Sequence, residues 1–269
     1  MIKFSSEGHK YESILPNGVK WTGVTTLVGS LKQPFDQIEK AAKCSVRKPG
    51  RYQNKWYGLS PVEILDAWSN ESKRSTDLGH WYHSKREQEL YEPDMQLMWG
   101  VQPPIIENGI KIARDQKLDI GIYPEHLCYL QSVGICGQAD YVQVTPTHKL
   151  NIRDYKTNKE IKTKGFTNWE GITTKMLKPV HHLDECEFNS YALQLSLYAY
   201  IILRHNSLLT LGELTIEHVE FELAGEDKYG YPITRLDDNN EPMVKNVKMI
   251  QIPYMLKEVQ SIIIWLKSK

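Results

Sequence analysis

Two carboxylates and a lysine lie in neighbouring segments of the chain that are both predicted to be β-strands. Asp140 lies in residues 134–144, and Asp154 and Lys156 lie in residues 150–156. Residues 145–149 between them contain a proline and are typical of a turn. Two carboxylates beside an ammonium group can bind a divalent cation and orient a water molecule on it. The chemistry that this set would perform is phosphodiester hydrolysis.

An antiparallel hairpin folded about residue 147 places Asp140 opposite Asp154. Directly opposed residues have Cβ atoms about 4.5–5.5 Å apart, so the two carboxylates can share one cation. Lys156 follows Asp154 by two residues and therefore lies on the same side of the strand. The alternative is a solvated strand face on which three charges are scattered without function.

Three further positions carry side chains that suit such a site. Glu125 lies on the predicted strand before the hairpin and offers a third carboxylate. His83 lies on a predicted helix, where a neutral imidazole can ligate Mn²⁺, although His80 nearby leaves open which histidine acts. Gln194 and Tyr198 are four residues apart on another predicted helix and share one face of it.

A basic segment, residues 43–57, has five cations and no acid, and aromatic residues are interleaved with the cations. Cations contact phosphates and aromatic rings stack on exposed bases, so this pattern favours nucleic-acid binding. An exposed basic loop without a partner is the alternative. The residues expected to bind DNA are Lys43, Arg47, Lys48, Arg51, Tyr52, Lys55, Trp56 and Tyr57.

The composition sets limits on the class of protein. The 269 residues carry 33 Lys and Arg against 33 Asp and Glu, so any basic surface is local. No apolar run is long enough to cross a membrane and no secretory signal begins the chain, so a cytoplasmic location is expected. The four cysteines are scattered without a C-x-x-C pair and are most simply free thiols.

The expected order of elements is a strand-like N-terminal region of about 30 residues, four helices, a strand group, one helix, further strands and a terminal helix. Helices are expected near 35–44, 60–70, 75–91, 103–117, 189–204 and 256–267. Strands are expected near 121–131, in the hairpin, and near 214–223 and 247–255. This order predicts a mixed α/β core with a helical N-terminal half.

Residues 158–188 form a long irregular stretch that is rich in lysine and aromatic residues. An ordered loop of this length inside a compact domain usually has a function. The part from Lys159 to Lys178, with Phe166 and Trp169, is expected to help hold a nucleic-acid strand.

The motifs in their order resemble the PD-(D/E)XK nuclease superfamily. Within it, the chain is most similar to the RecB-type branch, which includes the mitochondrial genome maintenance exonuclease and phage exonucleases. The motifs that carry the resemblance are Gly79-x-x-x-His83, Glu125, Gly137-x-x-Asp140, Asp154-Tyr155-Lys156-Thr157 and Gln194-x-x-x-Tyr198. They cover about residues 20–205. Asp154 stands where many members of the family have glutamate, and both residues ligate Mg²⁺.

The resemblance implies a restriction-endonuclease-like core and a Mg²⁺- or Mn²⁺-dependent deoxyribonuclease, with exonuclease action on DNA ends or single strands expected. The implied metal ligands are His83, Glu125, Asp140, Asp154 and the carbonyl group of Tyr155. Lys156 would orient the attacking water, and Gln194 and Tyr198 would position the phosphate or Lys156. No cysteine follows the Gln194 helix, so no iron–sulfur cluster is expected.

One nuclease domain is expected over residues 1–269. It comprises N-terminal strands and helices with a DNA-holding segment (1–117), a catalytic core (118–205) and C-terminal strands with a helix (206–269). The expected role is in replication, repair or recombination, with a replication or recombination protein as a possible partner and host cytoplasm as the location if the chain is phage-encoded. The alternatives are a nuclease-fold module that binds DNA or a partner without cutting, and an α/β protein with no nucleic-acid role.

Overall fold

The computed structural model describes residues 1–8, 10–16, 18–50, 54–94 and 100–269. Its largest sheet has the strand order β12-β9-β8-β7-β3, and β6 also pairs with β7. The pairs β8–β9 and β3–β7 are parallel and the others are antiparallel, so the sheet is mixed. The six strands are β3 (Thr22–Gly23), β6 (Gly121–Leu130), β7 (Ile135–Val144), β8 (Lys149–Lys156), β9 (Thr210–Phe221) and β12 (Val244–Gln251).

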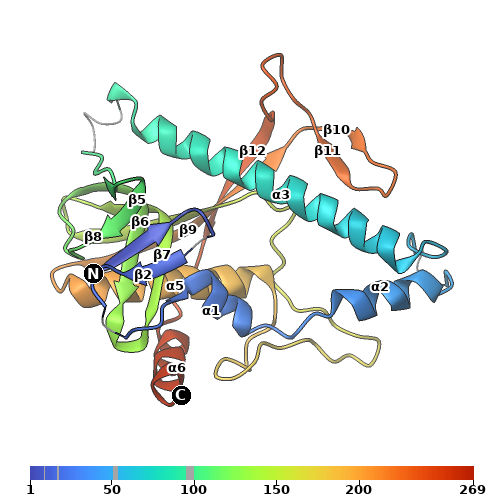
Figure 1. Cartoon of the computed structure of the whole chain (residues 1–269), viewed down its shortest axis with the longest axis horizontal. Helices are drawn as coiled ribbons and strands as arrows, with labels where there is room; N and C mark the ends of the chain where they lie inside the picture. Colours follow the sequence, from blue (N-terminus) through green and yellow to red (C-terminus); the bar gives the residue numbers. More distant parts are fainter. Residues whose placement is uncertain (9, 17, 51–53, 95–99) are drawn as a thin grey trace.

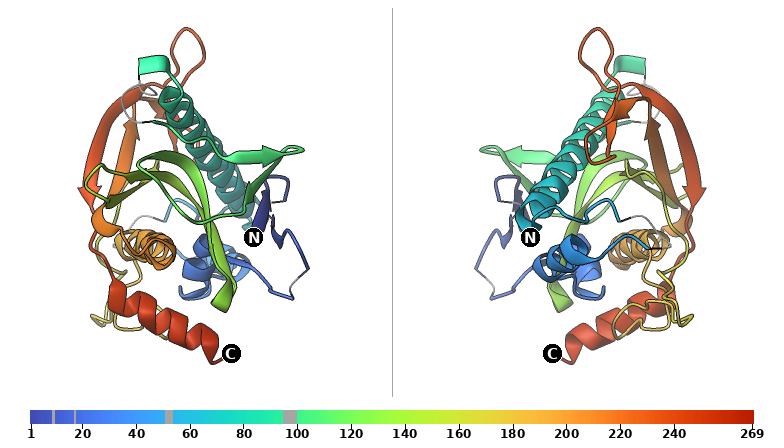
Figure 2. Two further views of the ribbon diagram at one scale, coloured as in Figure 1. Left: turned by 90° about the vertical axis from the view of Figure 1, so that its left-hand side faces the viewer. Right: turned by 90° about the vertical axis from the view of Figure 1, so that its right-hand side faces the viewer.

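Helices cover both faces of this sheet (Figures 1 and 2). One face packs against α5 (Glu187–His205), with α1 (Val24–Ser30) and α6 (Leu256–Lys267) completing the same core. The other face packs against the long helix α3 (Pro61–Leu90). The expected mixed α/β class, with a mixed sheet flanked by helices, is confirmed.

The remaining elements surround this core. The helix α2 (Gln37–Val46) packs against the N-terminal part of α3. A second sheet has the order β2-β1-β5-β4, and β10–β11 is a separate hairpin. These strands are β1 (Ile2–Ser5), β2 (Lys10–Ser13), β4 (Ile105–Glu107), β5 (Ile110–Ala113), β10 (Leu223–Glu226) and β11 (Pro232–Thr234), and a short 3₁₀ helix (Gln131–Val133) precedes β7. Across the described residues, no helix has both the length and the apolar character needed to span a membrane.

The helix α5 is apolar on nearly every side because it lies inside the core. Its buried residues include Leu193, Leu197 and Ile201, which meet the apolar side chains of β7 and β8. A helix with this composition is expected only where other elements surround it. Its position fixes where Gln194 and Tyr198 can point.

The predicted hairpin is confirmed in both position and register. Strands β7 and β8 are joined by residues 145–148, and Val142 pairs with Ile152 while Val144 pairs with Leu150. All four of these side chains are buried in the main core. A slip of one residue would turn them to the opposite face, so their burial fixes the register.

The helix predicted for residues 103–117 is wrong, because this region forms the hairpin β4–β5. Asn108 and Gly109 both have positive φ values, 50° and 76°, and make the tight turn. Strand β5 then pairs with β1, so its conformation depends on a partner more than 100 residues away.

Two other helix predictions need correction. The helices expected at 60–70 and 75–91 are one continuous helix, α3, because residues 71–74 contain no helix breaker. The capping box at Ser60 and Glu63 starts it as expected. Residues 24–30, expected to be strand-like, form α1, since Val24, Leu27 and Val28 are spaced to bury one helical face.

Candidate active site

At Asp140 the regular pairing of the central strand β7 is interrupted on the β6 side and ends on the β8 side. On β6, Pro124 pairs with Tyr141 and His126 with Ala139, so Glu125 stands opposite Asp140 outside the ladder. On β8, the pairing with β7 ends at Tyr141 and Arg153, one step before Asp154. The predicted register is therefore correct, but the two strands separate at the acidic pair. The candidate site occupies this opening.

Asp140 itself closes part of the gap. Its Oδ2 atom accepts a hydrogen bond from the backbone N–H of Tyr155 at 2.8 Å. The side chain thus takes the place of a backbone acceptor in the interrupted ladder. This bond holds the carboxylate in one orientation and leaves Oδ1 directed toward His83, whose Nδ1 atom is 3.6 Å away.

Glu125 has a left-handed backbone, with φ of 48°. For a residue other than glycine this conformation costs about 1–3 kcal/mol, and such strain is often found at functional sites. The amide of Gln138 donates a hydrogen bond to the Glu125 carboxylate, and the Lys111 ammonium donates to its backbone carbonyl at 3.4 Å. Neighbouring side chains therefore hold both the backbone and the carboxylate of Glu125.

The helix α3 is anchored to the sheet one residue before His83. The hydroxyl of Tyr82 donates to the Glu217 carboxylate on β9 at 2.7 Å. The same carboxylate pairs with Arg86 and Arg153, each at 3.0 Å, and Glu217 is only 2% exposed. This buried cluster fixes the rotation of α3 and with it the direction of the His83 side chain.

His83 is oriented as a metal ligand would be. Its Nε2 atom lies 3.1 Å from the carbonyl oxygen of Tyr155 and can donate to it only when protonated. In the neutral ring this places the lone pair on Nδ1, which lies 3.9 Å from the Glu125 carboxylate. Ligand atoms of His83, Glu125 and Asp140 lie within 4.8 Å of one another. A hydrogen bond that fixes the tautomer is common for metal-bound histidines.

Asp154 lies beside this group of three on the next strand, facing α5. It is 1% exposed, and its Oδ1 atom accepts a hydrogen bond from the Gln194 amide at 2.8 Å. Its Oδ2 atom forms an ion pair with Lys156. The ammonium of Lys156 also lies over the ring of Tyr191, 4.9 Å from its centre. The structure thus places Gln194 on Asp154, whereas the sequence suggested the phosphate or Lys156.

Tyr198 contacts β7 where Gly137 leaves room for it. A Cβ atom at Gly137 would lie 2.7 Å from Cε1 of the Tyr198 ring, closer than two carbon atoms can approach. Tyr198 is 2% exposed and belongs to the main core. Its position indicates that it supports the strand carrying Asp140, three residues after Gly137.

The charges of the site are strongly coupled. Burial raises the pKa of Asp140 to about 7, and the carboxylate of Asp154 adds to the effect. Burial alone would lower the pKa of His83, but Asp140 and Glu125 outweigh it and raise this pKa to about 9. For Lys156, burial is likewise outweighed by Asp154 and Asp140, so its pKa is raised and the side chain is protonated at neutral pH. Lys156 is therefore a cation in the metal-free site.

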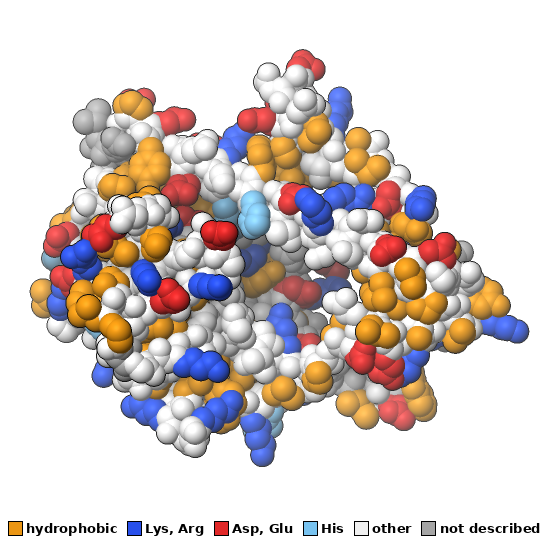
Figure 3. Space-filling view, in the orientation of Figure 1, with side chains coloured by type: hydrophobic (Ala, Val, Ile, Leu, Met, Phe, Trp, Pro, Cys, Tyr) orange, Lys and Arg blue, Asp and Glu red, His pale blue; other side chains and the backbone are white. Residues whose placement is uncertain are grey.

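These residues fit a divalent cation. Once Asp140 is ionised and His83 has lost its proton to act as a ligand, three carboxylates and one ammonium leave two negative charges in a largely buried position. The donor set of one imidazole and carboxylate oxygens suits Mn²⁺, and the oxygens also suit Mg²⁺. In Figure 3 the surface is hollowed near the centre of the view, and acidic, basic and histidine side chains gather around the hollow.

The basic segment lies at the other end of α3. Pro61, where α3 begins, is 22 residues before His83, which corresponds to about 33 Å of helix. Arg47, Lys48 and Tyr57 are exposed, whereas Lys43 pairs with Glu39. Arg51 and Tyr52 lie outside the described residues.

Trp56 requires a correction, because its ring is buried and cannot stack on a base. It is 9% exposed and packs against Trp68 of α3 and against Tyr229 and Tyr231. Lys55 donates to the Tyr229 carbonyl at 2.6 Å and lies over the Tyr231 ring. Both residues therefore join the basic segment to the β10–β11 hairpin.

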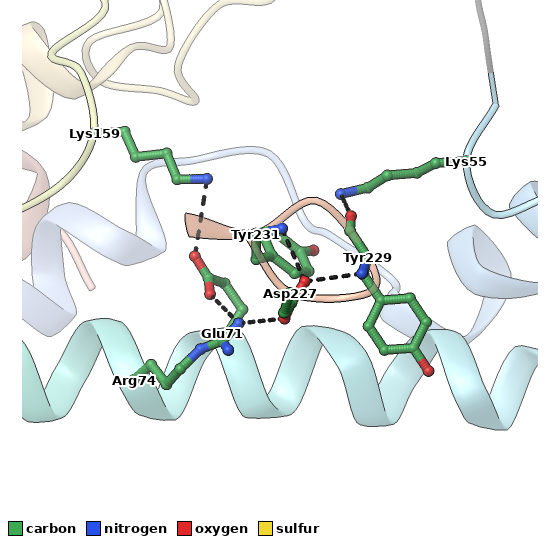
Figure 4. Close-up of polar contacts among 7 residues, drawn as sticks. All are labelled: Lys55, Glu71, Arg74, Lys159, Asp227, Tyr229 and Tyr231. Atoms are coloured by element: carbon green, nitrogen blue, oxygen red, sulfur yellow. Dashed lines mark hydrogen bonds and ion pairs between the residues drawn. The ribbon is translucent and has the colours of Figure 1, made fainter. Parts of the chain in front are cut away.

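A polar network ties this hairpin to α3 (Figure 4). Arg74 on α3 pairs with Asp227 of the hairpin at 2.7 Å and with Glu71 at 2.8 Å. Glu71 also lies 4.0 Å from Lys159, which follows β8. The N-terminal half of α3 therefore contacts the segment that directly follows β8, the strand that carries Asp154 and Lys156.

Several contacts at the site involve residues that sequence reasoning did not select. Gln138 holds the Glu125 carboxylate, Glu217 anchors α3, and Tyr191 contacts Lys156. Gln138 lies two residues before Asp140, so its place near the site follows from the strand period. Glu217 and Tyr191 gave no signal in the sequence, because their contacts depend on how distant elements pack.

No protein-family model matches the chain, and no match is found among curated proteins.

Proposed function

We propose that this protein is a metal-dependent nuclease of the PD-(D/E)XK type, of the RecB-like branch. The observation that carries the proposal is the convergence of His83, Glu125 and Asp140 beside the buried pair of Asp154 and Lys156. The order and spacing of the motifs support it independently of the geometry. A scattered set of surface charges would not bring five side chains from four elements together.

His83, Glu125 and Asp140 would hold the cation, and Asp154 would supply a further carboxylate from β8. The Tyr155 carbonyl would accept the Nε2–H of His83 and orient the ring; because it lies on the other side of the ring from Nδ1, it would not reach a cation held at Nδ1. A divalent ion bound there would lower the pKa of a water molecule and polarise the phosphate.

Lys156, protonated and fixed by Asp154, would donate to the water or to a phosphate oxygen. Gln194 is a positioning residue, since it fixes the Asp154 carboxylate that orients Lys156. Tyr198 supports β7 beneath Asp140.

DNA is the proposed substrate, with cleavage from an end or along a single strand. The exposed cations of the basic segment favour a polyanion over a small molecule. A role in replication, repair or recombination would follow from this activity.

The test compares end-labelled linear DNA, single- and double-stranded, with circular DNA of the same length, in Mg²⁺, Mn²⁺ or chelator. We expect metal-dependent degradation of linear DNA. Asp154→Asn and Lys156→Met should abolish cleavage while the protein still binds DNA. Glu107→Gln is the control, because Glu107 is an exposed carboxylate paired with Arg114 outside the site.

Equal degradation by wild type and Asp154→Asn would refute the assignment of the site. DNA binding together with Mn²⁺ binding, but without cleavage under any condition, would identify the chain as a non-catalytic module. Cleavage of circular DNA would replace the exonuclease proposal with an endonuclease.

A further inference from the structure

The loop between β8 and α5 carries a small hairpin whose apolar side chains point into solvent. Thr167 and Thr173 form a bridge between its two arms. Phe166, Trp169 and Ile172 are 75%, 91% and 62% exposed. We call residues 165–174 the aromatic hairpin. Large apolar side chains grouped in this way on a surface usually mark a binding site.

The tip of the aromatic hairpin is held in one conformation. The side-chain oxygen of Asn168 accepts hydrogen bonds from the backbone N–H groups of Glu170 and Ile172, at 3.0 and 2.9 Å. The backbone of Thr174 donates to the carbonyl of Phe166 at 2.8 Å. Because the backbone is fixed, little conformational entropy would be lost when Trp169 meets a partner.

The base of the aromatic hairpin is anchored in the main core. Met176 and Val180, just after it, are 1% and 0% exposed. Gln33, between α1 and α2, braces it through bonds to the Glu185 carboxylate and the Lys175 carbonyl, at 2.6 and 2.9 Å. The exposed tip is therefore a projection from a rigid base.

Both arms continue into elements that carry the candidate site. Lys156, at the end of β8, precedes Phe166 by ten residues, and Asn158 between them is held by Tyr191 and His218. The other arm leads into α5, whose Gln194 holds Asp154. The loop that carries the aromatic hairpin therefore begins and ends at elements of the candidate site.

Exposed lysines flank the aromatic hairpin and indicate the partner. Lys164 and Lys178 are exposed and form no ion pair within the described residues, whereas Lys162 pairs with Glu160 and Lys175 with Asp184. Cations beside exposed aromatic rings are the features that bind single-stranded nucleic acid, through phosphates and stacked bases.

We propose that the aromatic hairpin is a base-stacking contact for single-stranded DNA, in which Trp169 and Phe166 stack on bases and Lys164 and Lys178 contact phosphates. The inference rests on the proposed nuclease function and adds a second contact outside the metal site. It assigns the hairpin to binding and leaves the chemistry to His83 and the residues around it.

The test measures equilibrium binding of a fluorescent oligothymidylate to the full chain in chelator, so that cleavage plays no part. Alanine substitution of a stacked ring costs about 1–3 kcal/mol per base, so Trp169→Ala and Phe166→Ala should each weaken binding about 5- to 150-fold. Trp169→Phe should retain most of the affinity. Lys164→Ala should reduce the salt dependence of binding by about one phosphate contact.

Leu208→Ala is the matched control, because Leu208 is 83% exposed on a turn outside the hairpin and the site. It should bind DNA as the wild type does. Cleavage of a nitrophenyl ester of thymidine phosphate, too short to reach the hairpin, should be unchanged in Trp169→Ala.

Wild-type affinity in the Trp169→Ala, Phe166→Ala double variant would overturn the inference. If metal-dependent cleavage persisted in that variant, the nuclease proposal would stand and the apolar tip would be a docking site for a protein. A wild-type chain that neither binds nor cleaves DNA would overturn both proposals.

Discussion

The contact between Gly137 and Tyr198 allows a quantitative prediction. A methyl group at position 137 would lie 2.7 Å from Cε1 and 3.1 Å from the hydroxyl oxygen of Tyr198. The ring is 2% exposed and is packed in the main core. Overpacking of this kind costs about 1–3 kcal/mol, whereas replacing a strand glycine by alanine would otherwise stabilise by about 0.5–1 kcal/mol. We expect Gly137→Ala to lower the free energy of unfolding by about 1–2 kcal/mol.

Gly79→Ala is the matched control in the other glycine motif. A Cβ atom there would meet only the Thr157 hydroxyl at 3.5 Å, an ordinary contact. Because Gly79 lies inside α3, alanine should stabilise the protein by about 1 kcal/mol. Urea unfolding at constant m value measures both changes. In the double variant Gly137→Ala, Tyr198→Leu, the clash is removed, so the two changes together should cost less than their sum. A Gly137→Ala protein as stable as the wild type would refute the argument.

Other predictions concern the charges and the backbone of the site. Binding of Mn²⁺ requires an ionised Asp140 and a neutral His83, and the pKa values of these groups are raised to about 7 and about 9. The Mn²⁺ affinity measured by calorimetry should therefore increase from pH 6 to pH 9, and binding should release protons. An affinity that does not depend on pH would contradict this. The pKa values of both groups are higher in the folded protein than in the unfolded chain, so the free energy of unfolding of the metal-free protein should fall as pH rises through them. Because Mn²⁺ binds the deprotonated site, added Mn²⁺ should raise Tm more at pH 8.5 than at pH 6. Glu217→Gln removes the counterion of Arg153 and one of the two counterions of Arg86, which keeps Glu89, and should cost about 2–3 kcal/mol in urea unfolding while weakening Mn²⁺ binding. A loss of stability with unchanged Mn²⁺ affinity would mean that α3 is positioned by other contacts. Glu125→Gly removes the strain of the left-handed backbone, so the free energy of unfolding should rise by about 1 kcal/mol while the Mn²⁺ affinity falls. If the free energy of unfolding fell together with the Mn²⁺ affinity, the argument from backbone strain would be wrong.

Local patterns in the sequence predicted the elements whose conformation depends on nearby residues. The hairpin of β7 and β8 and its register follow from alternating apolar residues around a turn. The capping box at Ser60 correctly marks the start of α3. Residues 103–117 were misassigned because the pairing of β5 with β1 involves residues far apart in the chain. The sequence predicts two helices where α3 is one, because residues 71–74 contain neither a helix breaker nor an apolar residue that would link the two patterns.

The residue types of the candidate site could be predicted, but their contacts could not. Opposition of Asp140 and Asp154 follows from the hairpin, yet the separation of the strands at that point does not. The sequence does not show that Glu125 has a left-handed backbone, since nothing in Tyr-Pro-Glu-His requires it. Whether Lys156 could be a base depends on surrounding charges, and only the packed site shows that its pKa is raised.

The continuity of α3 constrains how the length of this protein can change in evolution. Arg74 is tied to Asp227, and His83, nine residues later, faces Asp140. Nine residues make two and a half turns and about 13.5 Å of helix. One inserted residue between them would rotate His83 by about 100° relative to Arg74, so only one of the two contacts could be kept. Relatives that keep both contacts should therefore show no insertions or deletions in this interval, although its exposed residues are free to vary.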